Sequence, residues 1–140
     1  MKKKIVKGKE VYEIDSKTCE EMFEVQEEVR KNTFPKAGGY CASVLTKKGN
    51  IDPGVAYQSD TYTLTIHGEA SALNHAAIHG EGKEIVAITG PNCHICKQLI
   101  YENSLRSNID IVVVVNEDGQ FKQIPISGLM PFPWPSEPQV

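Results

Sequence analysis

The chain has 140 residues, of which 40% are hydrophobic and 24% charged, and its net charge is −3. This length fits one domain with a substantial core and leaves no room for a separate cofactor domain. The mildly acidic balance argues against long nucleic-acid tracts as partners, because phosphate neutralisation normally needs a basic face. We therefore expect one globular domain over residues 1–140.

The start of the chain has neither a secretory nor a membrane-spanning pattern. Residues 2–4 are lysines, but only two apolar residues follow before Lys7, and no apolar run elsewhere approaches membrane-spanning length. We therefore expect a cytoplasmic protein. The four cysteines fit this expectation, because Cys19 and Cys41 are interpreted as small buried hydrophobic residues and the other two have the spacing of metal ligands.

Hydrophobic periodicity and turn signals predict alternating helices and strands along the chain. The first helix is expected over residues 18–32, opened by a capping box of Thr18 and Glu21. In chain order, the other predicted elements are strands 40–45 and 51–57, a helix from His67 to about Gly80, strand 84–89, a helix from Cys93 to about Tyr101, strands 110–115 and 121–124, and a helical turn at 127–130. This order predicts an α/β fold, a three-layer α-β-α sandwich around one mixed five-stranded sheet.

The helix that opens at His67 carries two further histidines. Its buried face is predicted from four apolar residues at helical spacing: Ile66, Ala70, Leu73 and Ala77. His75 and His79 lie four residues apart, a spacing compatible with a metal, but they fall roughly opposite the apolar face. We therefore expect them on a solvated surface.

Two motifs carry the chemistry of the chain, a His-x-Glu and, a short distance on, a Cys-x-x-Cys. His67, Cys93 and Cys96 offer one imidazole and two thiolates, three zinc ligands that leave a fourth position open for water. Glu69 would stand beside that water without binding the metal. Both motifs open predicted helices, where free N–H groups and the positive end of the helix dipole stabilise thiolates. The spacing therefore predicts the zinc site of a hydrolytic deaminase.

Two other interpretations of the Cys-x-x-Cys stay open. One is a redox pair, to which Pro91 and His94 give slight support, and the other is half of a structural zinc site. A structural site would need two further ligands at finger-like spacing, and no second cysteine pair is present. The His-x-Glu on the preceding helix favours the catalytic zinc site over both. His94 itself is expected to point outward.

Over residues 38–134 the sequence resembles the small cytidine deaminases, with blasticidin-S deaminases as close relatives. The resemblance rests on four segments, residues 45–51, 64–69, 93–98 and 129–131. It implies a zinc-bound hydroxide that attacks C4 of a cytosine-like ring, with Glu69 passing protons from the water to N3 and to the leaving ammonia. It also implies a homotetramer or a homodimer.

The segment that would hold the sugar departs from the family pattern. Where the family has Asn-x-Glu after the second strand, this chain has Ala-Tyr-Gln at residues 56–58. An alanine offers the ribose no hydrogen bond, so we expect either an appendage other than plain ribose or a ribose held by groups such as Gln58. The predicted substrate contacts are Ala56, Gln58, Tyr62, Gly68 and Trp134. By the resemblance Trp134 would reach into a neighbouring subunit, although packing explains Tyr62 and Trp134 about as well.

The sequence thus predicts a zinc-dependent aminohydrolase that acts on cytidine, deoxycytidine or a nucleoside analogue. A blasticidin-S-type antibiotic deaminase is the main alternative. A single-stranded nucleic-acid cytosine deaminase is less favoured, because the chain is acidic and has no basic-aromatic stripe. A non-catalytic zinc-binding protein is disfavoured by Glu69, because a structural site has no use for an unliganded buried carboxylate. Asp60, in the loop before the motif, is expected to be an exposed loop residue.

Overall fold

The computed structural model describes residues 1–140 and has a five-stranded sheet at its centre. The strands are β3 (Cys41–Thr46), β4 (Ile51–Val55), β5 (Ile85–Gly90), β6 (Val112–Glu117) and β7 (Gln120–Pro125). They lie in the order β4-β3-β5-β6-β7, with β5 and β6 parallel and every other neighbouring pair antiparallel. The prediction of one mixed five-stranded sheet is therefore confirmed.

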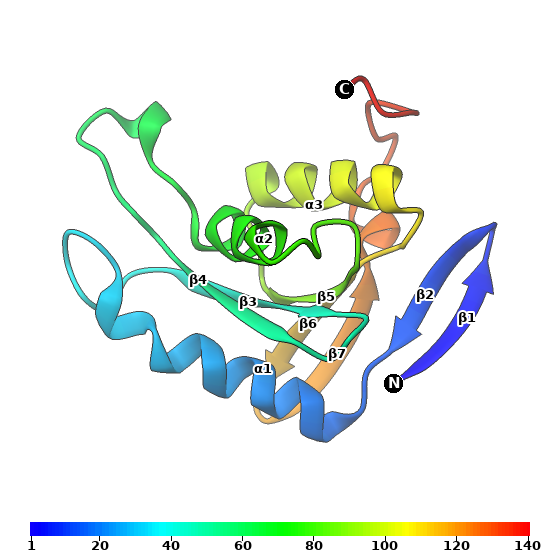
Figure 1. Cartoon of the computed structure of the whole chain (residues 1–140), viewed down its shortest axis with the longest axis horizontal. Helices are drawn as coiled ribbons and strands as arrows, with labels where there is room; N and C mark the ends of the chain where they lie inside the picture. The colour runs from blue at the N-terminus through cyan, green and yellow to red at the C-terminus, as the bar shows by residue number, and fades with distance from the viewer.

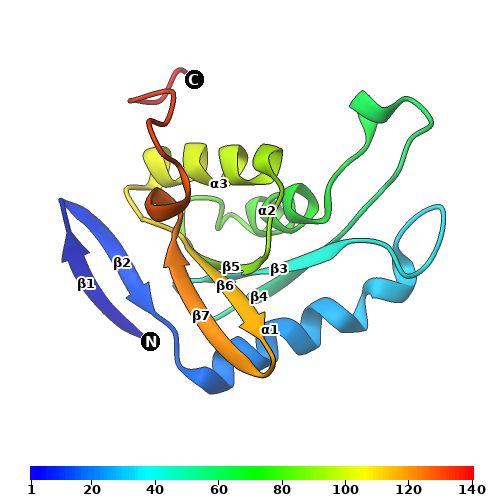
Figure 2. The ribbon, with the colours of Figure 1, turned by 180° about the vertical axis from the view of Figure 1, so that it is seen from behind.

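Three helices cover the two faces of this sheet. Helix α1 (Ser16–Glu28) packs on one face, whereas α2 (Gly68–Ile78) and α3 (His94–Ser107) lie together on the other, as Figure 1 shows from the front and Figure 2 from behind. Short 3₁₀ turns occupy residues 30–32, 62–64 and 126–129. The arrangement is the predicted three-layer α-β-α sandwich. None of the helices is both long enough and apolar enough to cross a membrane.

The two middle strands, β5 and β6, form the most buried part of the sheet. Residues 85–88 are fully inaccessible, and residues 112–114 are at most 1% exposed. Such apolar runs without polar alternation are expected where helices cover both faces of a sheet. The chain leaves β5 at Gly90 and enters α3 after three intervening residues, so the start of α3 is held by the tightly packed centre of the molecule.

An N-terminal hairpin, absent from the sequence predictions, forms a separate two-stranded sheet. Its strands β1 (Lys2–Val6) and β2 (Lys9–Glu13) pair antiparallel around a two-residue turn with positive φ. The Glu10 N–H donates to the carbonyl of Asn108 (3.1 Å), and the Asp110 N–H donates to the carbonyl of Glu10 (2.8 Å). These bonds attach β2 to the segment before β6. Strand β1 is exposed throughout and rich in lysine, so it lacks the apolar alternation from which strands are predicted.

The helix ends differ from the predictions for local reasons. The N-cap of α1 is Asp15, whose carboxylate accepts hydrogen bonds from the Thr18 N–H (3.1 Å) and the Thr18 hydroxyl (2.9 Å). The predicted capping box is therefore wrong, because Thr18 is a donor in the first turn and not the cap. These hydrogen bonds also lower the pKa of Asp15. Helix α3 runs beyond its predicted end to Ser107, where Asn108 adopts a left-handed conformation with φ of 59°.

Helix α2 buries only part of the face predicted for it. Ile66 and Ala77 are exposed, and the residues that face the core are Gly68, Ala72, Leu73 and Ala76. Because most of these are small, the helix approaches β4 closely: a Cβ atom at Gly54 would lie 2.1 Å from the backbone nitrogen of Ala72. The positions of large apolar residues therefore do not predict the buried face of a helix that packs mainly through glycine and alanine.

Candidate metal centre and active site

The two predicted motifs meet at the N-termini of neighbouring helices. His67 is the N-cap residue of α2, and Cys93 is the N-cap residue of α3. The Nδ1 atom of His67 lies 3.5 Å from the Sγ atom of Cys93 and 3.3 Å from that of Cys96, and the two sulfur atoms are 3.4 Å apart. Neither N-cap side chain accepts a capping hydrogen bond from its own helix. The N-cap positions of α2 and α3, where side chains usually cap the helix, therefore carry potential metal ligands that face one another.

The three donor atoms fit one zinc ion. Zinc–sulfur bonds of about 2.3 Å and zinc–nitrogen bonds of about 2.0 Å place the ligands of a tetrahedral site roughly 3.5–3.8 Å apart. The observed separations, 3.3 to 3.5 Å, are within a few tenths of an ångström of that range. Cys96 is buried and Cys93 is exposed, so the group of donors is reached from the side of Cys93. His94, between the two cysteines, is exposed as predicted.

The surroundings of Cys96 favour a divalent cation. Burial raises the pKa of the Cys96 thiol, and the neighbouring Cys93 and the Glu69 carboxylate raise it further. No lysine or arginine lines the cavity beside these groups. A metal cation is thus the charge that would ionise both thiols, and the N-terminal ends of α2 and α3 would add to its effect.

A cavity of about 410 Å³ opens beside the three donor atoms. Its lining residues are Tyr40, Cys41, Ala56, Gln58, Thr65, Ile66, His67, Glu69, Pro91 and Cys93. Ala56 and Gln58, both predicted as substrate contacts, are two residues apart on an extended segment, so their side chains point to the same side. Tyr57 between them points away and stacks on Phe34, with the ring centroids 4.6 Å apart. The structure therefore brings Ala56 and Gln58 to the cavity that also holds Glu69.

Several lining residues are absent from the sequence predictions. Thr65 and Ile66 directly precede His67, and Ile66 exchanges backbone hydrogen bonds of 2.9 and 3.0 Å with Tyr57. This pairing brings the segment before α2 alongside the 56–58 segment. Adjacency to His67 is the one signal in the sequence that could have identified Thr65 and Ile66. Tyr40 and Pro91 reach the cavity only through the fold.

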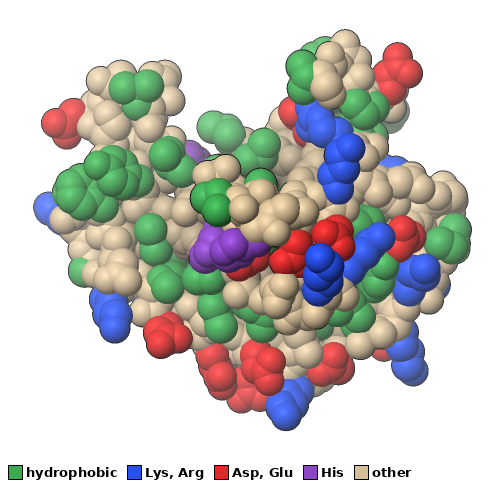
Figure 3. Space-filling view, viewed as in Figure 1, with side chains coloured by type: hydrophobic (Ala, Val, Ile, Leu, Met, Phe, Trp, Pro, Cys, Tyr) green, Lys and Arg blue, Asp and Glu red, His purple; other side chains and the backbone are tan.

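The other three predicted contacts lie outside the lining of this cavity. Tyr62 is 89% exposed on the segment that projects before α2, where Figure 3 shows hydrophobic side chains on the surface. Trp134 is 71% exposed in the C-terminal tail, and its carbonyl accepts a hydrogen bond from α3 (2.7 Å). Gly68 is buried, and a Cβ atom there would lie 2.7 Å from the Cα of Cys41. Asp60 is exposed, as predicted. Cys41, predicted to be buried, is only partly buried.

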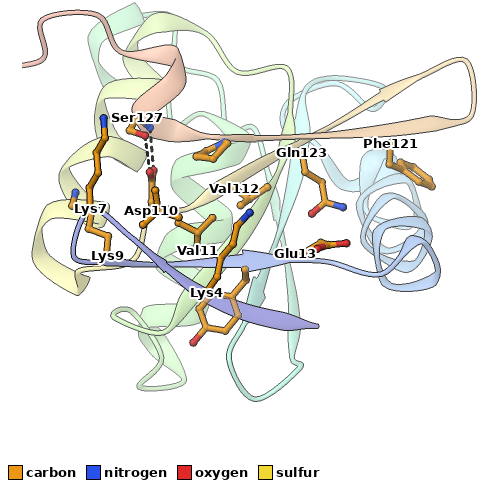
Figure 4. A pocket seen from close by; sticks show the side chains of 13 residues that line it. Lys4, Lys7, Lys9, Val11, Glu13, Asp110, Val112, Phe121, Gln123 and Ser127 are labelled. Carbon is orange, nitrogen blue, oxygen red and sulfur yellow. Dashed lines mark hydrogen bonds between the residues drawn. The ribbon is translucent and has the colours of Figure 1, made fainter.

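A larger cavity of about 660 Å³ lies between the N-terminal hairpin and β7 (Figure 4). Lys4, Lys7 and Lys9 from the hairpin line it, together with Asp110. The Asp110 carboxylate is already engaged, because it accepts hydrogen bonds from the Ser127 hydroxyl (2.6 Å) and the Ser127 N–H (3.1 Å). No cysteine or histidine lines this cavity, so it lacks the ligands of the predicted zinc chemistry.

Solved structures with the same arrangement of elements are cytidine deaminases. The cytidine deaminase from Burkholderia pseudomallei has a TM-score of 0.67 and 21% identity over 81% of this chain and 96% of its own. The cytidine deaminase from Mycobacterium leprae has a TM-score of 0.60 and 18% identity, covering 80% of this chain and 96% of its own. The one from Bacillus anthracis has a TM-score of 0.61 and 13% identity, covering 83% and 89%. No family model matches the sequence. The chain therefore has the cytidine deaminase fold.

Proposed function

We propose that this chain is a zinc-dependent hydrolytic deaminase of a cytosine-like amino-heterocycle. The observation that carries the proposal is the convergence of His67, Cys93 and Cys96 within 3.5 Å of one another beside a cavity that Glu69 also lines. The three similar solved structures described above, which are cytidine deaminases, support the same class of reaction. His67, Cys93 and Cys96 would hold the zinc ion, which when bound supplies Lewis-acid activation of a water molecule.

Glu69 is the residue of this chain that would move the proton. It lies in the first turn of α2 and lines the cavity, and its carboxylate raises the pKa of the Cys96 thiol. From this position the carboxylate takes one proton from water and delivers it to the ring nitrogen. It then takes the proton of the newly added hydroxyl group and delivers that second proton to the leaving amine. A C–N bond breaks and a C–O bond forms. One water is consumed and ammonia leaves, so the reaction needs no oxidant or reductant.

The cavity suits an uncharged heterocycle better than a nucleotide. Its volume of about 410 Å³ lies within the range of small-molecule sites. A phosphate group would need a cationic partner, and the lining contains one carboxylate and no lysine or arginine. Cytidine, deoxycytidine or a nucleoside analogue is therefore the first choice, with the amide of Gln58 available to the appendage. The absence of basic lining also weighs against single-stranded nucleic acid.

A blasticidin-S-type antibiotic is the alternative substrate that a specific observation favours. Ala56 lies on the cavity wall where the related enzymes would present an asparagine, so the usual ribose contact has no donor or acceptor there. An asparagine at this position would be left without a hydrogen-bond partner by an appendage other than ribose, which costs binding free energy. Alanine carries no such cost, so this wall accepts other appendages more readily.

A homo-oligomer, either a dimer or a tetramer, is part of the proposal. The segment before α2 exposes four large side chains next to the cavity: Tyr57, Tyr62, Leu64 and Ile66 are 53%, 89%, 68% and 48% exposed. An apolar group of this kind on one projecting segment marks an interaction surface. A neighbouring subunit that covers it would lie beside the cavity, where a partner's Trp134 could complete the wall.

Ammonia release from a panel of substrates tests the proposal. The zinc-loaded chain would be offered cytidine, deoxycytidine, free cytosine, blasticidin S and single-stranded DNA, with the chelator-stripped chain and a His94→Ala variant as controls. Release from cytidine or deoxycytidine by the loaded chain and by His94→Ala, but not by the stripped chain, is the expected result. Release from blasticidin S alone would assign the alternative substrate. Equal release by the loaded and stripped chains would contradict the role of zinc.

A further inference from the structure

A second group of metal-ligand side chains lies at the other end of α2. His75 is in the last turn of the helix, His79 is its C-cap residue, and Asp52 is on the adjacent strand β4. The Oδ1 atom of Asp52 lies 3.2 Å from Nδ1 of His79 and 3.9 Å from Nε2 of His75. The two histidines are partly exposed, in line with the predicted solvated surface, and they also lie over a carboxylate. Figure 3 shows histidine side chains exposed over α2.

The carboxylate of Asp52 lacks the partners that a buried charge needs. Its side chain is 8% exposed, and its Oδ2 atom is buried without a hydrogen-bond partner. No lysine or arginine forms an ion pair with it, and its nearest ionisable side chains are the two imidazoles. A buried carboxylate oxygen without a hydrogen-bond partner costs free energy unless a cation offsets the charge of the group. Asp52 therefore points to a positive charge between itself and the histidines.

The ring of His75 is oriented as a metal ligand would be. Its Nδ1 atom lies 2.8 Å from the carbonyl oxygen of Pro53, so Nδ1 carries the proton and donates it. In the neutral ring this leaves the lone pair on Nε2, the nitrogen that faces Asp52. The 3.9 Å from Nε2 to the carboxylate is too long for a hydrogen bond, and one ligand atom from each of the three residues lies within 4.8 Å of the others. A ligating histidine commonly donates its other N–H to a backbone carbonyl.

We propose that Asp52, His75 and His79 form a second site for a divalent transition-metal ion. Two imidazoles and one carboxylate select zinc, cobalt, nickel or copper rather than magnesium or calcium, which prefer oxygen ligands alone. The side chains of His75 and His79 are 38% and 50% exposed, so an ion reaches the site directly from solvent.

The position of the site at a helix C-terminus agrees with its charge. One divalent ion, one carboxylate and two neutral imidazoles carry a net charge of +1, and the C-terminal end of a helix dipole stabilises cations. The proposal does not depend on the deaminase function, because it concerns residues outside the cavity that Glu69 lines.

Cobalt titration of the whole chain tests the proposal. The protein would be stripped with a chelator, kept reduced and titrated with Co²⁺ alone while its absorption spectrum is recorded. We expect two bound equivalents: one gives the near-ultraviolet sulfur-to-cobalt band of Cys93 and Cys96, and the other gives only the visible bands of a nitrogen and oxygen site. Saturation at one equivalent, with the sulfur band complete, would overturn the second site.

Three variants separate the two sites. His75→Gln and Asp52→Asn should each weaken the second equivalent by more than the roughly 10- to 100-fold that an outer-shell partner contributes, with the sulfur band unchanged. The unchanged sulfur band also shows that a variant is folded, since that band needs α2 and α3 in place. His94→Gln removes an exposed histidine outside both groups and should keep two equivalents. Retention of two tight equivalents by both His75→Gln and Asp52→Asn would overturn the proposal.

Discussion

The two ends of helix α2 present different chemistry. At the N-terminal end, His67 lies beside two cysteines and a glutamate. These groups are anionic when ionised, and the helix dipole is positive at this end. At the C-terminal end, His75 and His79 meet a single aspartate, where the dipole is negative and favours a net cation. The ends are about 18 Å apart, from about 1.5 Å of rise per residue. One helix therefore offers two metal-ligand sets of opposite charge balance, each at the end that suits it.

The two ends of α2 also differ in whether a carboxylate remains beside the metal ligands to act as an acid or base. Beside the N-terminal group lies a cavity of about 410 Å³, lined by a carboxylate, Glu69, that the ligand set does not need. At the C-terminal end the one carboxylate, Asp52, is itself a ligand, and none of the three side chains lines that cavity. A free acid or base beside an open site is what hydrolysis requires. The proposals thus assign catalysis to the first end and metal binding alone to the second.

The largest effect is expected from Cys96→Ser. Losing a thiolate ligand should remove zinc from the N-terminal end and lower deaminase activity by more than about 100-fold, because a ligand contributes more than an outer-shell partner. Metal analysis and ammonia release measure the two effects. Cys19→Ala is the matched control, since the Cys19 side chain is fully buried in the core and is not among the grouped metal-ligand atoms. Equal losses of zinc and activity in Cys96→Ser and Cys19→Ala would contradict the assignment of Cys96 as a zinc ligand.

Gly54→Ala should disturb both ends together. The added Cβ atom would lie 2.1 Å from the Ala72 nitrogen and 2.3 Å from the Gly68 carbonyl oxygen, so α2 must move away from β4. We expect a loss of about 3 kcal/mol in the free energy of unfolding, measured by urea denaturation. Gly128→Ala is the control, because its Cβ atom would meet only the Ile124 side chain at 3.6 Å. Equal stability of the two variants would show that α2 is not held as described.

Gln58→Ala should affect substrate binding and leave metal binding intact. If the Gln58 amide holds the substrate appendage, its loss should raise KM about five-fold with little change in kcat, which corresponds to about 1 kcal/mol for one hydrogen bond. Ala56→Asn is the complementary change, and it should raise activity on ribose-bearing substrates relative to other appendages. An unchanged KM in Gln58→Ala would remove Gln58 from the substrate site.

The smallest effect is expected at the start of α1, a helix end used for stability. The Asp15 side chain makes capping hydrogen bonds to α1, whereas the side chains of His67 and Cys93 make none to α2 and α3. Because its folded-state pKa is lowered by the Thr18 hydrogen bonds, Asp15 stabilises the fold above the ordinary aspartate pKa of about 3.9 and loses this effect as the pH falls through the lowered value. Asp15→Ala should therefore lower Tm slightly at neutral pH and not in strong acid. A pH-independent difference in Tm would contradict this role.

Local signals predicted the N-terminal end of α2 well and the C-terminal end poorly. The His-x-Glu and Cys-x-x-Cys spacings identify groups whose partners are set by two helix starts, and the structure brings those groups together. The Asp52 partnership depends on which face of α2 meets β4, and that face is chosen by the close approach at Gly54, which apolar periodicity does not reveal.

The remaining differences have similar physical causes. The order of strands and helices along the chain was predictable, because β5 and β6 are continuous apolar runs. The N-terminal hairpin was not, because it is attached through backbone hydrogen bonds of Glu10 and has an exposed lysine-rich strand. Tyr62 and Trp134 lie away from the cavity of one chain, so their predicted contacts with substrate depend on a second subunit.

The most direct test of the account is a paired measurement on Glu69→Gln. Zinc content and ammonia release from the best substrate of the panel would be determined for this variant and for the unaltered chain. We expect equal zinc content and a fall in turnover of at least about 100-fold, because the amide cannot accept the proton from water. Turnover equal to that of the unaltered chain, with zinc bound, would contradict the assignment of Glu69 as the proton carrier.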